Sequence, residues 1–153
     1  LNEVLKASAR PSISLIALLL ATILINPSFA QGEENKKMDP KLENISGMYA
    51  ECAAYFAIAY NALLSSGDTN TADQYATMQE SAVSTALFLA AQGRTLEMAH
   101  KVTKSRIQMY QQKMKKDIED SYANISILLN KYTFLCKEAL ENPEKFIGKL
   151  KDK

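Results

Sequence analysis

Apolar side chains recur at intervals of three and four residues along most of the chain from residue 39 to residue 141. Such spacing places them on one face of an α-helix. Only 5 Gly and 4 Pro interrupt the 153 residues, which is too few for the frequent turns of an all-β domain. We therefore predict an all-α fold with a single core.

The first two predicted helices are delimited by residues that favour helix ends. The first begins at Asp39-Pro40, an N-cap residue followed by the proline favoured at the first helical position, and it ends in the turn-forming run 65–68. The second begins with a capping box at Thr71 and stops at Gly93, since glycine readily adopts the conformation that closes a helix. The apolar face of the first helix consists of Leu42, Ile45, Tyr49, Cys52, Phe56, Ala59 and Leu63.

Upstream of these helices, residues 1–30 have the pattern of a secretory signal. Lys6 and Arg10 precede an apolar run from residue 13 to residue 25, and small residues occupy the −3 and −1 positions of a cleavage site after Ala30. The run is shorter than the about 20 residues that a membrane-spanning helix needs. We predict cleavage after Ala30, export to the periplasm or the medium, and no membrane span in the mature chain. An uncleaved anchor is the alternative.

A third helix, capped by Thr95, continues the apolar spacing without a break to Leu140. The 2 cysteines argue for a break, because an exported protein with one such pair most often joins it and a disulfide requires Cα atoms about 4.4–6.8 Å apart. At ~1.5 Å rise per residue, Cys52 lies at a height of ~20 Å along the helix axis, measured from Asp39. An unbroken helix would carry Cys136 to a height of ~70 Å, whereas a reversal at 119–124 returns Cys136 to ~27 Å. We therefore predict an antiparallel four-helix bundle closed by a Cys52–Cys136 disulfide. Two buried free thiols and an intermolecular bridge are the alternatives.

The segments that flank the predicted bundle at 39–141 are short. Residues 31–38 are polar and are expected to form a disordered lead-in. A short basic amphipathic helix is predicted over 142–153, with Phe146 and Ile147 on its apolar side. A helix of about ten residues more often docks on its own domain than on a membrane. Binding of this helix to an anionic membrane is the alternative.

Charge is unevenly placed in the predicted mature chain, although its 16 basic and 16 acidic residues balance. Six basic residues and no acid lie between Met98 and Lys116. At about 100° per residue these scatter around a helix and form no stripe, so a basic helix packed beside acidic ones is the favoured interpretation. The alternative is a surface for an acidic partner, for which Lys101, Lys104 and Lys113 are the candidates. Nothing in the composition indicates nucleic-acid binding.

The sequence contains no catalytic constellation. Its single His cannot supply the two E-x-x-H pairs of a di-iron bundle, and neither the C-x-x-C-H of haem attachment nor the G-x-S-x-G of a hydrolase occurs. His100 and Met48 fall at similar heights along their predicted helices and are candidates to ligate a haem together. Methionines in helical proteins are, however, more often core fillers. We expect no enzyme activity, no metal and no bound cofactor.

The helix predicted from residue 39 also carries candidates for a partner surface. Tyr55 lies off its main apolar face, where an aromatic ring suits a protein interface. Six alanines between Ala50 and Ala62 would let another helix approach closely. That helix is either a neighbour in the same chain or part of a second subunit in a homo-oligomer.

Two short elements resemble a group of small exported bacterial helical proteins of unknown function. One is ECAAYF at 51–56, and the other is KYTFLCK at 131–137, which is followed by Asn-Pro at 142–143. The resemblance implies helices and paired cysteines and favours a bacterial envelope. We expect a non-enzymatic periplasmic or secreted protein that binds a protein or envelope partner. The alternative is a carrier of a small molecule or haem in the bundle interior.

Overall fold

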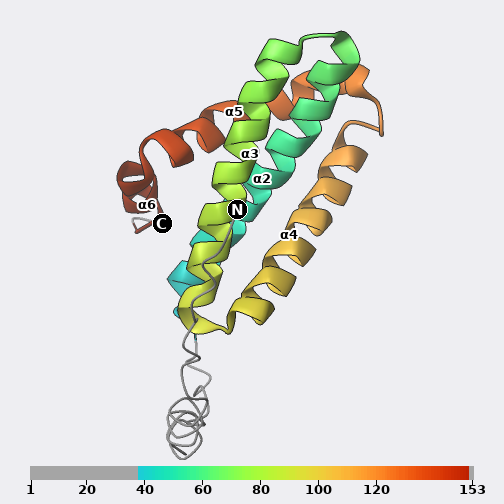
Figure 1. Ribbon diagram of the computed structural model, residues 1–153. Helices are drawn as coiled ribbons and strands as arrows, with labels where there is room; N and C mark the ends of the chain where they lie inside the picture. Colours follow the sequence, from blue (N-terminus) through green and yellow to red (C-terminus); the bar gives the residue numbers. More distant parts are fainter. Residues whose placement is uncertain (1–37, 152–153) are drawn as a thin grey trace, which may run out of the picture. The chain divides into compact units, whose positions relative to one another are not determined.

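The computed structural model describes residues 38–151, with side chains as far as residue 148. The predicted signal at 1–30, and the predicted lead-in except its last residue, lie outside the described residues. The described part is all-helical without a strand, as predicted, and none of its helices combines the length and apolar character needed to cross a membrane. Its elements are α2 (Pro40–Ser66), α3 (Thr69–Ala90), η3 (Ala91–Gly93), α4 (Leu96–Asp117), η4 (Tyr122–Asn124), α5 (Ser126–Glu141) and α6 (Pro143–Lys151), shown in Figure 1.

Polar caps and a glycine set the ends of the first helices. The Asp39 carboxylate accepts a hydrogen bond from a backbone N–H in the first turn of α2 at 2.8 Å. Gly67 ends α2 at a φ of 84°, in the left-handed region that glycine adopts without steric cost. The predicted start of the second helix is wrong by a few residues. The Asp68 carboxylate, rather than the Thr71 hydroxyl, is the cap, because it accepts from the Thr71 N–H at 3.1 Å.

α2 is the central helix of the described residues. It contacts α3, α4 and α5, and every residue from Cys52 to Ala59 is buried. A helix that is apolar on all sides belongs inside a protein, so the single apolar face predicted for this segment is too narrow. The alanines are covered by helices of the same chain. Where α2 meets α3, for example, the Ser46 hydroxyl donates to the backbone carbonyl of Ala86 at 2.9 Å.

Tyr55, predicted to lie on a partner surface, is buried in the core, and that prediction is wrong. Its side chain is 0% exposed, and its ring centroid lies 6.1 Å from that of Tyr75 and 5.7 Å from that of Tyr132. Its hydroxyl lies 2.6 Å from the Thr133 hydroxyl on α5 and 3.4 Å from the Tyr75 hydroxyl. The physical reason is that α5 covers a second side of α2, which the spacing along α2 cannot reveal.

The chain reverses between α4 and α5, as predicted for 119–124. Glu119 and Asp120 follow the end of α4 at φ values of 54° and 53°, a left-handed conformation that is uncommon for residues other than glycine. The Asn124 side chain then donates to the backbone carbonyl of Ile118 at 3.2 Å. This turn brings α5 back to α2.

A disulfide joins Cys52 of α2 to Cys136 of α5, with Cα atoms 5.4 Å apart. The predicted pairing is therefore confirmed, and both residues are buried. Beyond the bond, the Tyr49 hydroxyl donates to the backbone carbonyl of Ala139 at 2.7 Å, so α5 runs antiparallel to α2 where the two touch. In Figure 1, however, α2, α3 and α4 run alongside one another while α5 crosses them. The described helices thus do not establish the regular four-helix bundle.

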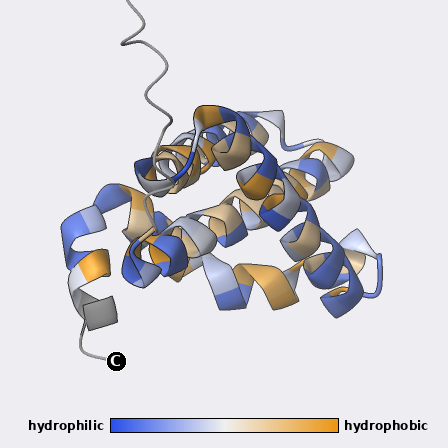
Figure 2. Ribbon diagram, turned by 90° about the horizontal axis from the view of Figure 1, so that it is seen from below, coloured by the Kyte–Doolittle hydropathy of each residue, from blue (hydrophilic) through white to orange (hydrophobic). Residues whose placement is uncertain are grey.

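α6 docks on the same core, as expected of a short helix. Phe146 is buried, and its ring meets the edge of Tyr49 with centroids 6.0 Å apart. Lys145 also forms an ion pair with Glu138 of α5 at 3.6 Å. Figure 2 shows apolar and polar residues intermixed along each helix, as amphipathic packing requires.

Loss of the disulfide is expected to lower the free energy of unfolding by about 2–4 kcal/mol, because the bond closes a long loop in the unfolded chain. Urea unfolding of the wild type and of Cys52→Ala/Cys136→Ala, each with and without reductant, measures this effect. Reductant should move the wild-type midpoint toward that of the double variant and leave the variant unchanged. A wild-type midpoint that ignores complete reduction contradicts the prediction.

Tyr55→Phe is expected to lower the free energy of unfolding by about 1–2 kcal/mol, because it removes the buried hydrogen bond to Thr133. The matched control is Tyr60→Phe, since Tyr60 is only partly buried and its hydroxyl has no hydrogen bond within residues 38–148. Chemical denaturation should separate the two variants. Equal losses would show that the Tyr55 hydroxyl contributes nothing specific.

Candidate functional site

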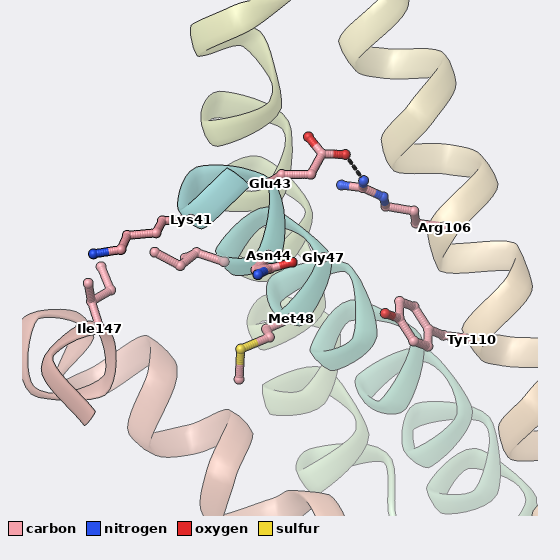
Figure 3. A pocket seen from close by; sticks show the side chains of 9 residues that line it. Lys41, Glu43, Asn44, Gly47, Met48, Arg106, Tyr110 and Ile147 are labelled. Atoms are coloured by element: carbon pink, nitrogen blue, oxygen red, sulfur yellow. Dashed lines mark hydrogen bonds and ion pairs between the residues drawn. The ribbon is translucent and has the colours of Figure 1, made fainter. Parts of the chain in front are cut away.

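A pocket of about 490 Å³ lies over the N-terminal half of α2. In Figure 3, α2 forms its floor, α4 lies on one side and α6 on the other. The volume is within the range of small-ligand sites, roughly 300–1,000 Å³. Its lining combines charged, polar and apolar side chains: Lys41, Glu43, Asn44, Ile45, Gly47, Met48, Arg106, Tyr110 and Ile147.

Glu43, in the first turn of α2, is held by two arginines. Its carboxylate forms an ion pair with Arg94 at 2.7 Å and another with Arg106 of α4, which Figure 3 marks with a dashed line. The three side chains retain 21–28% of their exposed surface, so these ion pairs lie at the edge of the core. They tie the start of α2 to α4 and to the segment that precedes α4.

The two arginines lower the pKa of Glu43. Burial is the largest single influence and raises this pKa from the ordinary value of 4.5, but the short contacts with Arg94 and Arg106 and the positive charges of these arginines together outweigh it. Glu43 is therefore ionised at neutral pH.

Gly93 allows Arg94 to reach Glu43. A Cβ atom on Gly93 would lie 2.7 Å from the Cα of Met38, a separation that real Cβ atoms do not adopt. Met38, two residues before the start of α2, therefore passes directly over η3, and Arg94 also donates to the Met38 sulfur. Any larger residue at position 93 would push this crossing apart.

Four hydrogen-bond donors around the pocket have no partner among the described residues. They are the Lys41 ammonium, the Asn44 amide, the Tyr110 hydroxyl and the Arg106 nitrogen Nη1, and this last atom is also shielded from water. Burial, together with the charge of Glu51, raises the pKa of Tyr110 although Arg106 opposes the shift. Its hydroxyl therefore keeps its proton and remains available to donate.

The surface lysines predicted as partner contacts, Lys101, Lys104 and Lys113, are all exposed on α4. α4 buries only a narrow strip of its surface, which includes Ala99 and Met114. These lysines are scattered around the helical projection, but because the buried strip is narrow they all lie on the broad side of α4 that faces solvent. We call this the basic face of α4. Its members are Lys101, Lys104, Lys113, Lys115 and Lys116, and within the described part of the chain none of them forms an ion pair.

The structure does not bring the two predicted haem ligands together. Met48 lines the pocket over α2, whereas His100 is exposed and lines a separate groove between α3 and α4. Across residues 38–148, no group of three His, Cys, Asp or Glu side chains is placed to hold a metal ion.

Glu43 and its arginine partners were not predicted as site residues from the sequence. The available signal was the scarcity of arginine, because the chain beyond residue 30 contains 14 lysines but only Arg94 and Arg106. Arginine is preferred where a planar fork must hold a carboxylate. Both of these arginines contact the same glutamate.

Glu43→Gln is expected to lower the free energy of unfolding at neutral pH by about 1–3 kcal/mol, because it removes two ion pairs, of which the one with Arg106 is a charge-assisted hydrogen bond. A carboxyl whose pKa is depressed in the folded state stabilises the protein above its unfolded pKa, and this contribution disappears as the pH falls through the folded value. The difference in the free energy of unfolding between wild type and variant should therefore be largest above the ordinary pKa of 4.5 and should vanish in stronger acid.

The matched control for this prediction is Glu80→Gln, because Glu80 is exposed on α3 and has no ion pair within residues 38–148. Thermal unfolding of the three proteins across acid and neutral pH provides the measurement. A loss in Glu43→Gln that is independent of pH, or equal to that of Glu80→Gln, would contradict the role of the ion pairs.

Comparison of the chain with protein-family models, with curated proteins and with solved structures gave no match.

Proposed function

We propose that this protein is a non-enzymatic binding protein that works outside the cytoplasm, in a bacterial periplasm or the surrounding medium. The signal pattern of residues 1–30 supports export. The disulfide also supports it, since such bonds persist in oxidising compartments. Both cysteines are buried, which suits a structural bond better than a redox centre. The resemblance of 51–56 and 131–137 to small exported bacterial proteins agrees with this location.

The proposed binding surface is the basic face of α4, and the proposed partner is an acidic protein or envelope component. The observation that carries this proposal is that all five lysines of the face are exposed and unpaired within the described residues, with no acid between Met98 and Lys116. Unpaired charges of one sign attract a partner of the opposite sign and speed its association. Met109, which is 54% exposed on the same helix, adds apolar contact area.

A second candidate function is the carriage of a small molecule in the pocket over α2. Its volume and its four unpartnered donors favour this role. The haem version of the hypothesis is not favoured, because His100 and Met48 line different cavities.

Site-specific photo-crosslinking in the cells that make the protein tests the binding surface. A photoreactive residue replaces Ser105, which is exposed on α4 between the lysines, or Ser81, which is exposed on α3. We expect a discrete covalent adduct from position 105 and none from position 81, because the partner covers only the basic face.

A charge-matched pair of triple variants provides the control. Lys101→Gln/Lys104→Gln/Lys113→Gln removes three positive charges from α4, and Gln74→Glu/Thr77→Glu/Ser81→Glu adds three negative charges to the exposed side of α3. The adduct at position 105 should fall at least about tenfold in the first variant and persist in the second, because loss of adjacent charge pairs acts locally. An equal fall in both, or no adduct at position 105, would contradict the proposed surface.

A further inference from the structure

The pocket over α2 carries an excess of positive charge. Lys41 and Arg106 line it, and Arg94 joins it through Glu43. Among the described residues Glu43 is the only acid in the lining, so these four groups carry a net charge of +2 at neutral pH. An anion in the pocket would therefore be attracted rather than repelled.

Two donors face the pocket from the same side of α4. Arg106 and Tyr110 are four residues apart, which places them one above the other on a helix. Arg106 uses its Nη2 atom to bind Glu43, while its Nη1 atom is buried and donates to nothing among the described residues. A buried donor of a charged group that lacks an acceptor is costly. The Tyr110 hydroxyl also lacks a partner among the described residues and, unlike Nη1, it is accessible to a ligand in the pocket.

Gly47 contributes no side chain to the floor of the pocket near Tyr110. The Tyr110 oxygen lies 3.9 Å from the point that a Cβ on Gly47 would occupy, so a side chain at this position would touch the hydroxyl.

The pocket also has apolar lining residues. Ile45 and Met48 of α2 and Ile147 of α6 line it, and Figure 3 shows Met48 and Ile147 toward α6, away from Arg106 and Tyr110, with Lys41 reaching toward Ile147. The pocket thus combines cationic groups with an apolar surface. A ligand that matches both is an anion with a hydrocarbon part.

We propose that this pocket binds an aliphatic carboxylate. The carboxylate accepts a hydrogen bond from the Tyr110 hydroxyl and is attracted by the positive charges of Lys41 and Arg106, and the hydrocarbon chain packs on Ile45, Met48 and Ile147. This inference rests on the second candidate function, small-molecule carriage, and is independent of the basic face of α4.

Three ligands with the same hydrocarbon tail test the proposal on the full mature chain: octanoate, 1-octanol and octylammonium. Binding is measured by calorimetry and by the NMR shift of the Met48 methyl group, with Met109 on the solvent side of α4 as the internal reference. We expect octanoate to shift the NMR signal of the Met48 methyl group and not that of the Met109 methyl group. Octanol should bind at least about fivefold more weakly, and octylammonium should not bind, because it places a cation beside Arg106.

Two variants locate the ligand within the pocket. Tyr110→Phe should weaken octanoate binding about fivefold and leave the unfolding midpoint unchanged, since its hydroxyl has no partner among the described residues. Tyr60→Phe, outside the pocket, should change neither. Met48→Glu should abolish octanoate binding, because it places a second carboxylate in the pocket.

The possible failures are distinguishable. Octanol that binds as tightly as octanoate would overturn the carboxylate inference and leave small-molecule carriage standing. Octanoate binding that is unchanged in Tyr110→Phe would overturn the placement of the carboxylate. No shift of Met48 with any of the three ligands would overturn both the inference and the carrier function.

Discussion

The described fold depends on the burial of α2 from every side. Helices can cover another helix in this way only if they approach its backbone closely, and alanine permits that approach because its side chain is a single methyl group. The stretch from Cys52 to Ala59 is buried throughout, and α3, α4 and α5 all contact α2. The large rings of Tyr55 and Phe56 then fill the space that the alanines leave. Because three helices share this one element, the position of each depends on the same set of side chains.

This dependence explains which features the sequence could predict. The cap at Asp39 was predictable because a cap involves residues within one helical turn. The break at 119–124 was predictable for another reason, since the short reach of a disulfide excluded a continuous helix. Tyr55 could not be placed, because the unbroken run of buried residues from Cys52 to Ala59 has no helical periodicity to mark an outer side. Its environment is set by α5, which crosses α2 from the far end of the chain.

The site was hard to predict because its central contacts are long-range. Glu43 and Arg106 are separated by 63 positions in the sequence, and spacing rules relate only neighbours on one helix. Yet this ion pair is what gives the pocket its character. A lysine in place of Arg106 would bring a charged nitrogen to Glu43 without the planar guanidinium that suits a carboxylate. The residue that joins α2 to α4 therefore also places a positive charge in the lining of the pocket.

The disulfide and the pocket are connected through Tyr49. Its hydroxyl binds the carbonyl of Ala139, one turn beyond Cys136, and its ring packs against Phe146 of α6. The next residue in α6, Ile147, forms the apolar wall of the pocket. α5 is covalently fixed to α2 only where cysteines are oxidised, and α6 follows α5 directly. If the chain is exported as proposed, the wall of the pocket is therefore held most firmly after export, in the compartment where a ligand or partner would be met.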